Sequence, residues 1–373
     1  MRRSIPFAAV VAALGLAACD QAATLSPETE ALANRSENAP IYLVSFKDGV
    51  DVQSAAQDIS RARGFMLRYV RQHAAKGFSA VIPASQLEAV RNDPRVALVE
   101  KDGPVALVAP VQGNARPGGG GGSTQTVPWG IAKVGGAGDG TGKTAWVIDS
   151  GIDLAHADLN TSRSCHAYFA GTSPADGNGH GTHVAGTIGA INNGIDVVGV
   201  AANAYLCSVR VLGNSGSGSW EGVVNGVNFV AANASSGDVA NMSVGGSGGN
   251  VTLENAIRDA AARGIKFTIA AGNSSQDASL ETPARLNATN VFTISSIASN
   301  GCLSSFSNYG LGVDFAAPGS SVLSTRKGGG TTTMSGTSMA APHAAGVMLL
   351  GAPRTNGVAC GDKDAVPDPI ISR

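Results

Sequence analysis

The chain has 373 residues, of which 43% are apolar and 14% charged, and its formal net charge is −1. This length accommodates one large domain and a smaller one, and the 50 glycines indicate a packed core with many tight turns. The near-zero net charge and the 5% aromatic content argue against nucleic acid or an anionic membrane surface as a partner.

The first 19 residues predict an export signal. Residues 1–3 are largely basic, residues 5–18 form an apolar run too short for a permanent membrane span, and Cys19 follows. The sequence LAAC ending at Cys19 resembles the bacterial lipobox, in which the cysteine is lipidated, and Asp20 resembles an inner-membrane retention signal. The alternative is an ordinary secretory signal that contains a cysteine by chance. Either way, we expect the protein in the periplasm or outside the cell, with membrane attachment if Cys19 carries a lipid.

After a polar tether at 20–40, residues 41–108 predict a small α+β domain. The patterns indicate strands at 41–46, 77–82 and 96–102 and helices at 50–62 and 85–93. Residues 109–123 are rich in glycine and predict an exposed linker of the kind that proteases cut.

Residues 124–373 predict a parallel sheet covered by helices on both faces. Short β-branched runs, which indicate strands, alternate with helical patterns at 221–233 and 251–264. The expected strands are 144–149, 204–212, 239–244, 266–272 and 290–297. Functional sites in such sheets form at the carboxyl ends of the strands, and Asp149 lies at such an end.

Residues 137–144, AGDGTGKT, resemble a phosphate-binding loop and raise a nucleotide-binding enzyme as an alternative. A phosphate loop requires a strand before it and a helix after it, whose N-terminal amides face the phosphates. Here the loop leads into the strand at 144–149 instead. We therefore expect a surface turn.

Three segments carry the side chains that acyl transfer needs. Asp149 ends a buried strand, His180 opens a helix of small residues, and Ser338 lies at the start of another helix. A serine hydroxyl becomes nucleophilic when an imidazole removes its proton, and a buried carboxylate fixes the tautomer of that imidazole. Each residue alone is most simply a cap, a turn former or a structural side chain. Their joint occurrence favours a Ser-His-Asp site.

These residues lie in the motifs DSGID (149–153), HGTHVAG (180–186) and GTSMAAPH (336–343), which in this order resemble the signatures of the subtilase family of serine peptidases. The resemblance covers residues 41–350. It implies a three-layer α/β fold with a mostly parallel sheet, no catalytic cofactor and a monomeric serine endopeptidase of polypeptides. Residues 41–108 would be an inhibitor-type propeptide that assists folding and occupies the active site as an intramolecular inhibitor until self-cleavage removes it from a catalytic domain at 124–373. An inactive homologue that only binds peptides is a further alternative.

The resemblance also assigns roles. Asp149 would orient the base, His180 would act as general base and acid, Ser338 as nucleophile, and Asn273 as a donor to the oxyanion. The implied substrate contacts are Gly216, Ser217, Gly218, Trp220, Ser243, Val244, Gly245, Ala270, Ala271 and Gly272. Trp220 would line an outer apolar pocket. Since Ser274 places no charge beside the specificity pocket, we expect a broad apolar preference.

A structural calcium site is implied in the same way, because the segment 190–200 resembles the calcium loop of the subtilisins. Clustered oxygen ligands are what calcium prefers. The implied ligands are the side chains of Gln125, Asp158 and Asn193 and the carbonyls of Ile191, Ile195 and Val197. The alternative is a surface loop that binds nothing. A ligand at Gln125 places the mature N-terminus near Thr124.

The remaining histidines and cysteines have structural interpretations. We expect His183 and His343 to be structural because no third metal ligand accompanies them. Four cysteines outside the signal, in an exported chain, favour two disulfides with three alternative pairings. We favour Cys165–Cys207 and Cys302–Cys360. Departures from the family pattern are Ala157, Ala341 and a short tail at 351–373, which leaves open how the core is closed.

Overall fold

The computed structural model describes residues 40–108 and 124–373. The predicted signal with its lipobox, nearly all of the predicted tether and the linker at 109–123 lie outside the described residues. Residues from Pro40 onward form one compact unit.

The N-terminal part of this unit is an antiparallel sheet with two helices packed against it. The strand order is β2-β3-β1-β4, and an apolar core that includes Phe46 and Phe78 lies between sheet and helices. Asp51 caps α2 through the backbone N–H of Ser54, and Gly64 ends that helix in the left-handed conformation. The elements are β1 (Ile41–Phe46), α2 (Val52–Arg63), β2 (Leu67–Arg71), β3 (Gly77–Val81), α3 (Ala84–Arg91) and β4 (Val96–Lys101). All except β2 were predicted.

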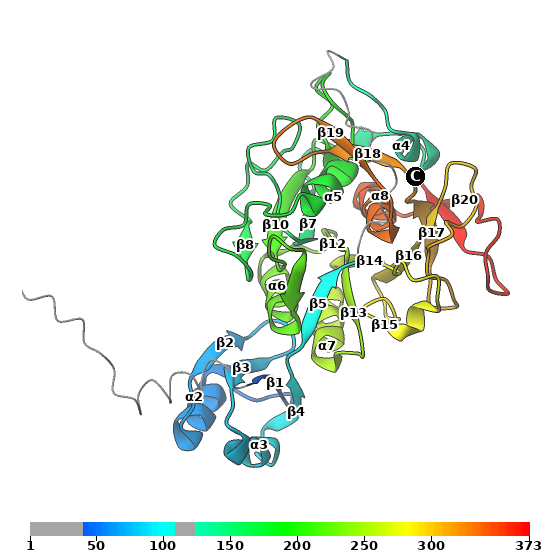
Figure 1. The fold of residues 1–373 in the computed structure, drawn as a ribbon. Helices are drawn as coiled ribbons and strands as arrows, with labels where there is room; N and C mark the ends of the chain where they lie inside the picture. Colours follow the sequence, from blue (N-terminus) through cyan, green and yellow to red (C-terminus); the bar gives the residue numbers. More distant parts are fainter. Residues whose placement is uncertain (1–39, 109–123) are drawn as a thin grey trace, which may run out of the picture. The chain divides into compact units, whose positions relative to one another are not determined.

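The C-terminal part contains, within the described residues, a nine-stranded sheet in the order β20-β21-β17-β16-β14-β12-β7-β10-β8. All neighbouring strands are parallel except β20 and β21 (Figure 1). The mostly parallel sheet is therefore confirmed. The strands are β7 (Thr144–Asp149), β8 (Ala167–Tyr168), β10 (Tyr205–Arg210), β12 (Val239–Met242), β14 (Lys266–Ala270), β16 (Val291–Ile297), β17 (Phe315–Pro318), β20 (Arg354–Val358) and β21 (Pro369–Ser372).

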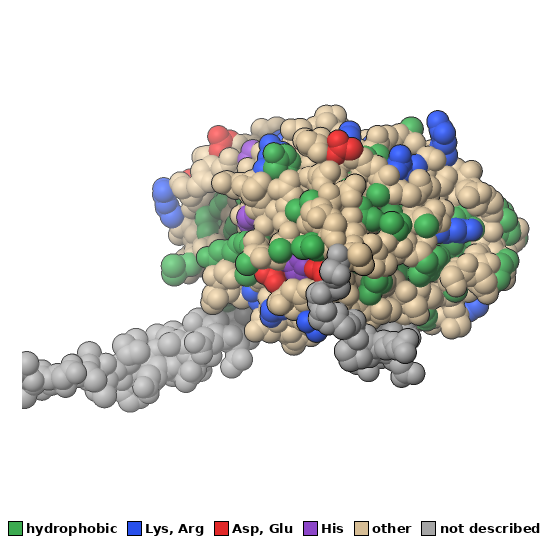
Figure 2. Space-filling view, turned by 90° about the horizontal axis from the view of Figure 1, so that it is seen from above, with side chains coloured by type: hydrophobic (Ala, Val, Ile, Leu, Met, Phe, Trp, Pro, Cys, Tyr) green, Lys and Arg blue, Asp and Glu red, His purple; other side chains and the backbone are tan. Residues whose placement is uncertain are grey.

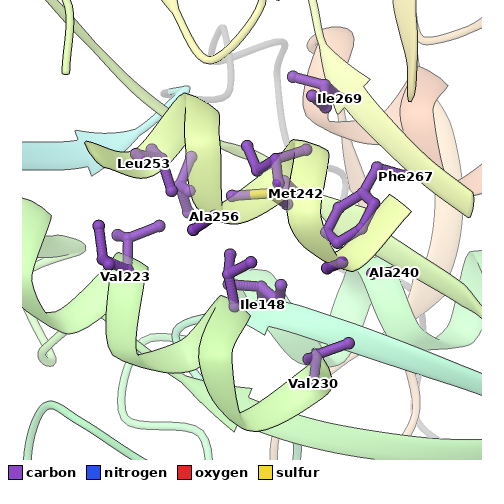
Figure 3. Packing of buried hydrophobic residues seen from close by; sticks show 14 of the residues in the cluster. Ile148, Val223, Val230, Ala240, Met242, Leu253, Ala256, Phe267 and Ile269 are labelled. Atoms are coloured by element: carbon purple, nitrogen blue, oxygen red, sulfur yellow. The ribbon is translucent and has the colours of Figure 1, made fainter. Parts of the chain in front are cut away.

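Helices cover both faces of this sheet. Trp146 and Ile148 of β7 pack in one apolar cluster with α6 and α7, whereas Ala145 and Val147 pack in another with α5 and α8. This alternation follows from the two-residue period of a strand. Figure 3 shows residues of the first cluster, with Val223 and Leu253 from the helices and Ile148 and Met242 from the strands. The helices are α4 (Trp129–Lys133), α5 (His180–Gly189), α6 (Trp220–Asn233), α7 (Val251–Ala261), the 3₁₀ turn η1 (Ala278–Leu280) and α8 (Thr337–Leu350).

Short strands complete the fold. The most consequential sheet runs β11-β5-β13-β15, in which β5 follows the N-terminal part directly in sequence. Its members are β5 (Pro104–Leu107), β11 (Ser217–Ser219), β13 (Val244–Ser247) and β15 (Glu281–Thr282). Two-stranded sheets join β18 (Val322–Thr325) with β19 (Thr331–Met334) and β6 (Gly138–Asp139) with β9 (Ala201–Ala202).

The segment that resembles a phosphate loop enters a strand, as predicted. Lys143 lies in a turn between β6 and β7. The next helix along the chain after this turn is α5, which begins at His180. The amides of this turn therefore have no helix dipole behind them.

The C-terminal tail closes one edge of the sheet. β21 pairs in parallel with β17, and β20 pairs with β21. Disulfides join Cys165 to Cys207 and Cys302 to Cys360, which confirms the favoured pairing. The second disulfide fastens the tail to the turn after β16.

In the described part of the chain, no helix combines the length and apolar character needed to cross a bilayer. On the face displayed in Figure 2, Lys and Arg side chains are scattered over the described surface.

Candidate active site

Asp149 occupies the carboxyl end of β7, between β10 and β12 in the sheet. The residue is 0% exposed. The backbone N–H of Ser150 donates to Asp149 Oδ1 over 2.6 Å, and this bond orients the carboxylate toward α5.

His180 is the first residue of α5 and is also buried. Its Nδ1 lies 2.9 Å from Asp149 Oδ1 and 3.0 Å from Oδ2. Gly181 permits this approach, because a Cβ on it would lie 2.0 Å from the carbonyl oxygen of Gly151. His180 Nε2 is buried and has no hydrogen-bond partner among residues 40–108 and 124–373.

The loop before α5 is fastened by Asp176, which the sequence analysis did not identify. Asp176 Oδ1 accepts from Ser150 Oγ at 2.9 Å and from the Gly179 backbone at 2.8 Å. Its Oδ2 accepts from the backbone and the hydroxyl of Thr182 at 3.0 and 2.6 Å. One buried carboxylate thus ties the strand end that carries Asp149 to the helix start that follows.

Ser338 is the second residue of α8 and is buried. Its Oγ donates to the carbonyl oxygen of Val108 over 2.7 Å. The Ser338 hydroxyl, at the start of α8, therefore contacts Val108, the last described residue before the linker.

Asn273, which follows β14, reaches the same carbonyl. Its Nδ2 donates to Val108 O over 3.4 Å. Its Oδ1 accepts from the backbone N–H and the hydroxyl of Thr337, at 2.8 and 2.9 Å. The Thr337 hydroxyl in turn accepts from Gly272 N at 3.1 Å. Thr337 therefore fixes which atom of the Asn273 amide faces Val108.

The strand β5 lies between the two segments expected to hold a substrate. Gly218 pairs with Val105, and Val244 pairs with Leu107, both antiparallel. Hydrogen bonds from Leu107 N to Gly216 O (2.9 Å) and from Val108 N to Ser243 O (3.2 Å) extend the pairing to the carbonyl at Ser338. Ser217 and Gly245 pair with Ala106 in the same ladder.

A cavity of about 380 Å³ lies beside Val108. Of the expected contacts, Val244, Gly245, Ala270 and Gly272 line it, whereas Ala271 is buried and does not line it.

Trp220 begins α6 and is 5% exposed, packed in one cluster with Val105. A Cβ on Gly246 would lie 3.0 Å from Trp220 Cζ2, so the indole lies along β13. The side chain of Val105 is therefore packed with Trp220 in the apolar cluster, three residues before Val108, which contacts Ser338.

Ser274 itself places no charge beside the pocket, but a second residue, which the expectation from Ser274 did not include, supplies one. Glu281, at the start of β15, lines the cavity together with Ser274. Burial raises the pKa of the Glu281 carboxyl, and a hydrogen bond from Gln276 opposes that rise. The residue was missed because the turn between Asn273 and β15 brings it back to the pocket, which no local pattern indicates.

The six residues implied as calcium ligands gather at one place. Gln125 Nε2 donates to the carbonyls of Ile191, Ile195 and Val197 at 2.6, 3.3 and 2.9 Å. Asp158 Oδ2 accepts from Val197 N, while its Oδ1 is buried and has no partner in the described residues. Desolvation raises the pKa of Asp158 to about 7, and the hydrogen bond from the Val197 backbone opposes that rise.

His183 and His343 are fully buried in helices. His183 Nε2 lies 3.0 Å from Val322 O, and His343 Nδ1 lies 2.8 Å from Met339 O. Desolvation lowers the pKa values to about 3 and about 4, so both imidazoles are neutral. No group of three or more His, Cys, Asp or Glu side chains suited to a metal occurs in the described residues.

Comparison with protein families gives two matches. Residues 140–353, more than half of the chain, match a family described as the subtilase family. Residues 41–108 match a family described as peptidase inhibitor I9.

Individual relatives agree with these matches. Alkaline serine exoprotease A of Vibrio alginolyticus is 40% identical over 374 residues, covering 94% of this chain and 65% of that protein, just under two thirds of its length. Subtilisin-like serine protease AsES of Sarocladium strictum is 39% identical, covering 82% and 78%. A solved structure described as a cold adapted subtilisin-like serine proteinase is 44% identical, with a TM-score of 0.55, covering 61% of this chain and 85% of the other.

Proposed function

Because this chain belongs to the subtilase family of serine peptidases and carries a peptidase inhibitor I9 domain ahead of the subtilase match, we propose that it is a self-processing zymogen acting through Ser338, His180 and Asp149. The observation that carries this proposal is the Val108 carbonyl, which accepts from Ser338 Oγ at 2.7 Å and from Asn273 Nδ2 at 3.4 Å. A peptide carbonyl held by a hydroxyl and an amide donor is in the position of a reacting substrate.

The proposed reaction is acyl transfer. Ser338 Oγ attacks the carbonyl carbon while its proton passes to His180 Nε2, the ring nitrogen that has no partner in the described residues. Asp149, bonded to Nδ1, fixes the tautomer and stabilises the imidazolium. The imidazolium then protonates the departing amine, and a water molecule activated by His180 releases the acyl group from Ser338.

Asn273 would stabilise the negative charge that develops on the carbonyl oxygen. Its amide is already oriented by Thr337, so little reorganisation accompanies the reaction. Removing a side-chain donor of this kind lowers kcat by about 10²–10³-fold, as measured in subtilisin.

Substrates would bind as an added strand, the way β5 pairs with β11 on one side and with β13 on the other. Figure 1 shows β5 beside β13. In this mode main-chain hydrogen bonds supply affinity and pockets between alternate side chains supply preference. By this analogy the Trp220 pocket receives the residue that Val105 represents, three positions before the cleaved bond's carbonyl. The substrates would be polypeptides.

The first self-cleavage would fall between Val108 and Ala109. This bond directly follows the carbonyl that contacts Ser338, whereas the mature N-terminus near Thr124 would require later trimming of residues 109–123. The proposed boundaries are thus a propeptide at 41–108, a removable linker at 109–123 and a catalytic domain at 124–373.

After cleavage, several contacts would keep the propeptide bound as an inhibitor. Glu100 accepts from Thr252 N at 2.6 Å at the start of α7, and Asp102 accepts from Glu221 N at 2.9 Å at the start of α6. Carboxylates at helix N-termini are favourable because they oppose the helix dipole. Arg68 Nε pairs with Glu221 at 3.0 Å.

A structural calcium ion is proposed at Gln125, Asp158, Asn193 and the three carbonyls bonded to the Gln125 amide. The buried Asp158 Oδ1, which has no partner among residues 40–108 and 124–373, lies beside converging carbonyl oxygens and fits a hard cation. The Gln125 amide can contribute its oxygen after a rotation that exchanges Nε2 and Oε1. Chelation should lower the melting temperature of the Ser338→Ala protein, and Asp158→Asn should abolish the response to added calcium.

The protein would be exported as a monomer and would carry a lipid on Cys19. The two disulfides support an oxidising compartment. Mass spectrometry of the N-terminal peptide tests the lipid, which Cys19→Ala would remove, and size-exclusion chromatography tests the monomer.

A serine-reactive phosphonate tests the catalytic assignment. We expect labelling at Ser338 and hydrolysis of casein, both lost in Ser338→Ala, and N-terminal sequencing should place the first cut after Val108 only in the active protein. Labelling that persists in Ser338→Ala, or an alanine variant that is still processed when expressed alone, would refute the proposal.

A further inference from the structure

The cavity beside Val108 receives the side chain that precedes the cleaved bond. Val108 supplies the carbonyl at Ser338, and its Cγ2 lies 3.4 Å from the place where a Cβ on Gly245 would stand, at the cavity wall. The branched side chain of Val108 ends there. A cavity of about 380 Å³ remains beyond it. The site is therefore built for a longer side chain than that of valine.

Glu281 places a carboxylate in this cavity. Its Cγ lies 3.5 Å from the position of a Cβ on Gly272, next to the oxyanion donor Asn273. Oε1 accepts from Gln276 Nε2 at 2.9 Å, which holds the side chain in place. No hydrogen bond to Oε2 is formed by residues 40–108 and 124–373, so this oxygen is left as an acceptor.

The remaining walls are neutral. Val244, Ala270, Pro283 and Ala284 supply apolar surface, and Glu281 is the only charged residue among the described residues that line the cavity. A lysine or arginine side chain suits both features, since its methylene stem covers apolar surface while its charged head reaches a polar partner.

Building on the proposed function, we propose that Glu281 makes this peptidase prefer lysine or arginine immediately before the cleaved bond. A hydrogen bond between ionised groups stabilises more than one between neutral groups, and the partly enclosed cavity limits screening by solvent. An apolar side chain of equal length fills the same cavity but leaves the carboxylate without a partner.

Val108 itself does not need this preference for cleavage. It is tethered to the catalytic domain through residues 109–123 and held by the β5 ladder, so its bond is presented at a high effective concentration. A separate substrate has no such tether and depends on its own contacts in the cavity.

The test compares two anilide peptides, Val-Ala-Leu-Lys and Val-Ala-Leu-Met, whose first three residues copy residues 105–107. Lysine and methionine have unbranched side chains of similar length and differ in charge. We expect the processed wild-type enzyme to favour lysine in kcat/KM, and Glu281→Gln to lower the Lys/Met ratio about tenfold, the factor that corresponds to about 1.4 kcal/mol.

Asp277→Asn is the matched control. It removes a nearby carboxylate that does not line the cavity, and asparagine caps η1 as well as aspartate does. The Lys/Met ratio should not change in this variant. Glu281→Ala serves as a second removal if Glu281→Gln does not fold. In the wild type, raising the salt concentration to about 1 M should lower the ratio, without any substitution.

The outcomes separate this inference from the proposed function. Hydrolysis of both peptides with a Lys/Met ratio that neither Glu281 substitution nor salt alters would overturn the preference and leave the peptidase standing. A wild-type protein that is not labelled by the phosphonate and hydrolyses neither peptide would overturn both.

Discussion

Replacing Thr337 by valine removes a hydroxyl that bridges two parts of the site. The hydroxyl donates to Asn273 Oδ1 over 2.9 Å and accepts from the buried Gly272 N–H over 3.1 Å. The Thr337 backbone N–H, 2.8 Å from the same Oδ1, remains in the variant. Of the two bonds from Thr337 to Asn273 Oδ1, the variant therefore keeps one, and the Asn273 Nδ2 is aimed less accurately at the oxyanion.

The expected loss in kcat is about 5–10-fold, because one neutral hydrogen bond is worth about 1 kcal/mol and about 1.4 kcal/mol corresponds to tenfold. This is well below the loss of about 10²–10³-fold expected for Asn273→Ala. KM should change little, since the donor acts on charge that develops in the transition state. The unpaired Gly272 N–H should also lower the free energy of unfolding by about 1–3 kcal/mol.

Steady-state kinetics on a single anilide peptide give kcat and KM, and thermal unfolding in the Ser338→Ala background gives stability without self-digestion. Thr337→Ser keeps the hydroxyl and is the control. If Thr337 acts through Asn273, Thr337→Val should lower kcat no further once Asn273 is alanine. An unchanged kcat in Thr337→Val, or an equal loss in the presence and absence of Asn273, would refute this mechanism.

Three further predictions use melting temperatures of the unprocessed Ser338→Ala protein. Glu100→Ala should destabilise it by about 1 kcal/mol, the value of a helix cap, whereas Glu100→Asp should lose less; equal effects would contradict the capping role. Desolvation raises the pKa of Asp368 to about 7, so the folded state holds a proton that the unfolded state releases above about pH 4. The contribution of Asp368 to stability therefore falls as pH rises from about 4 to 7, and Asp368→Asn should flatten this dependence; an identical pH profile would exclude it. Replacing Cys302 and Cys360 by serine opens a link across a sequence separation of 58 residues and should destabilise by about 2–4 kcal/mol, and an unchanged melting temperature would show that the link is dispensable.

The central sheet was predictable because its strands are locally distinctive. Thr144–Asp149 is a continuous apolar run, buried on both faces, and its order relative to the helical patterns indicates a parallel sheet. The triad residues were identified from three short motifs, whose order along the chain resembles that of the subtilase signatures. Local sequence also showed that the glycines before Thr144 lead into a strand.

The propeptide was predicted as the occupant of the active site, but the strand through which it binds was not, for a physical reason. The strand Pro104–Leu107 has four residues, follows Gly103, and owes its conformation to partners more than 100 positions away along the chain. The same holds for Glu281, whose place in the cavity depends on a turn that returns to Asn273. The strand Leu67–Arg71 was also missed, since its polar residues alternate weakly and its pairing with β3 defines it.

The backbone hydrogen bonds that β5 forms with β11 and β13 have a consequence for which proteins this enzyme can digest. When residues 104–108 depart, β11 and β13 face each other across a slot one extended chain wide, with amide and carbonyl groups exposed on both rims. A segment already engaged in its own helix or sheet cannot enter such a slot, because it must first come free over several residues. The rate at which a folded protein is digested should therefore not exceed the rate of its local unfolding. Stably folded proteins should resist digestion, whereas partly or fully unfolded proteins should be cleaved.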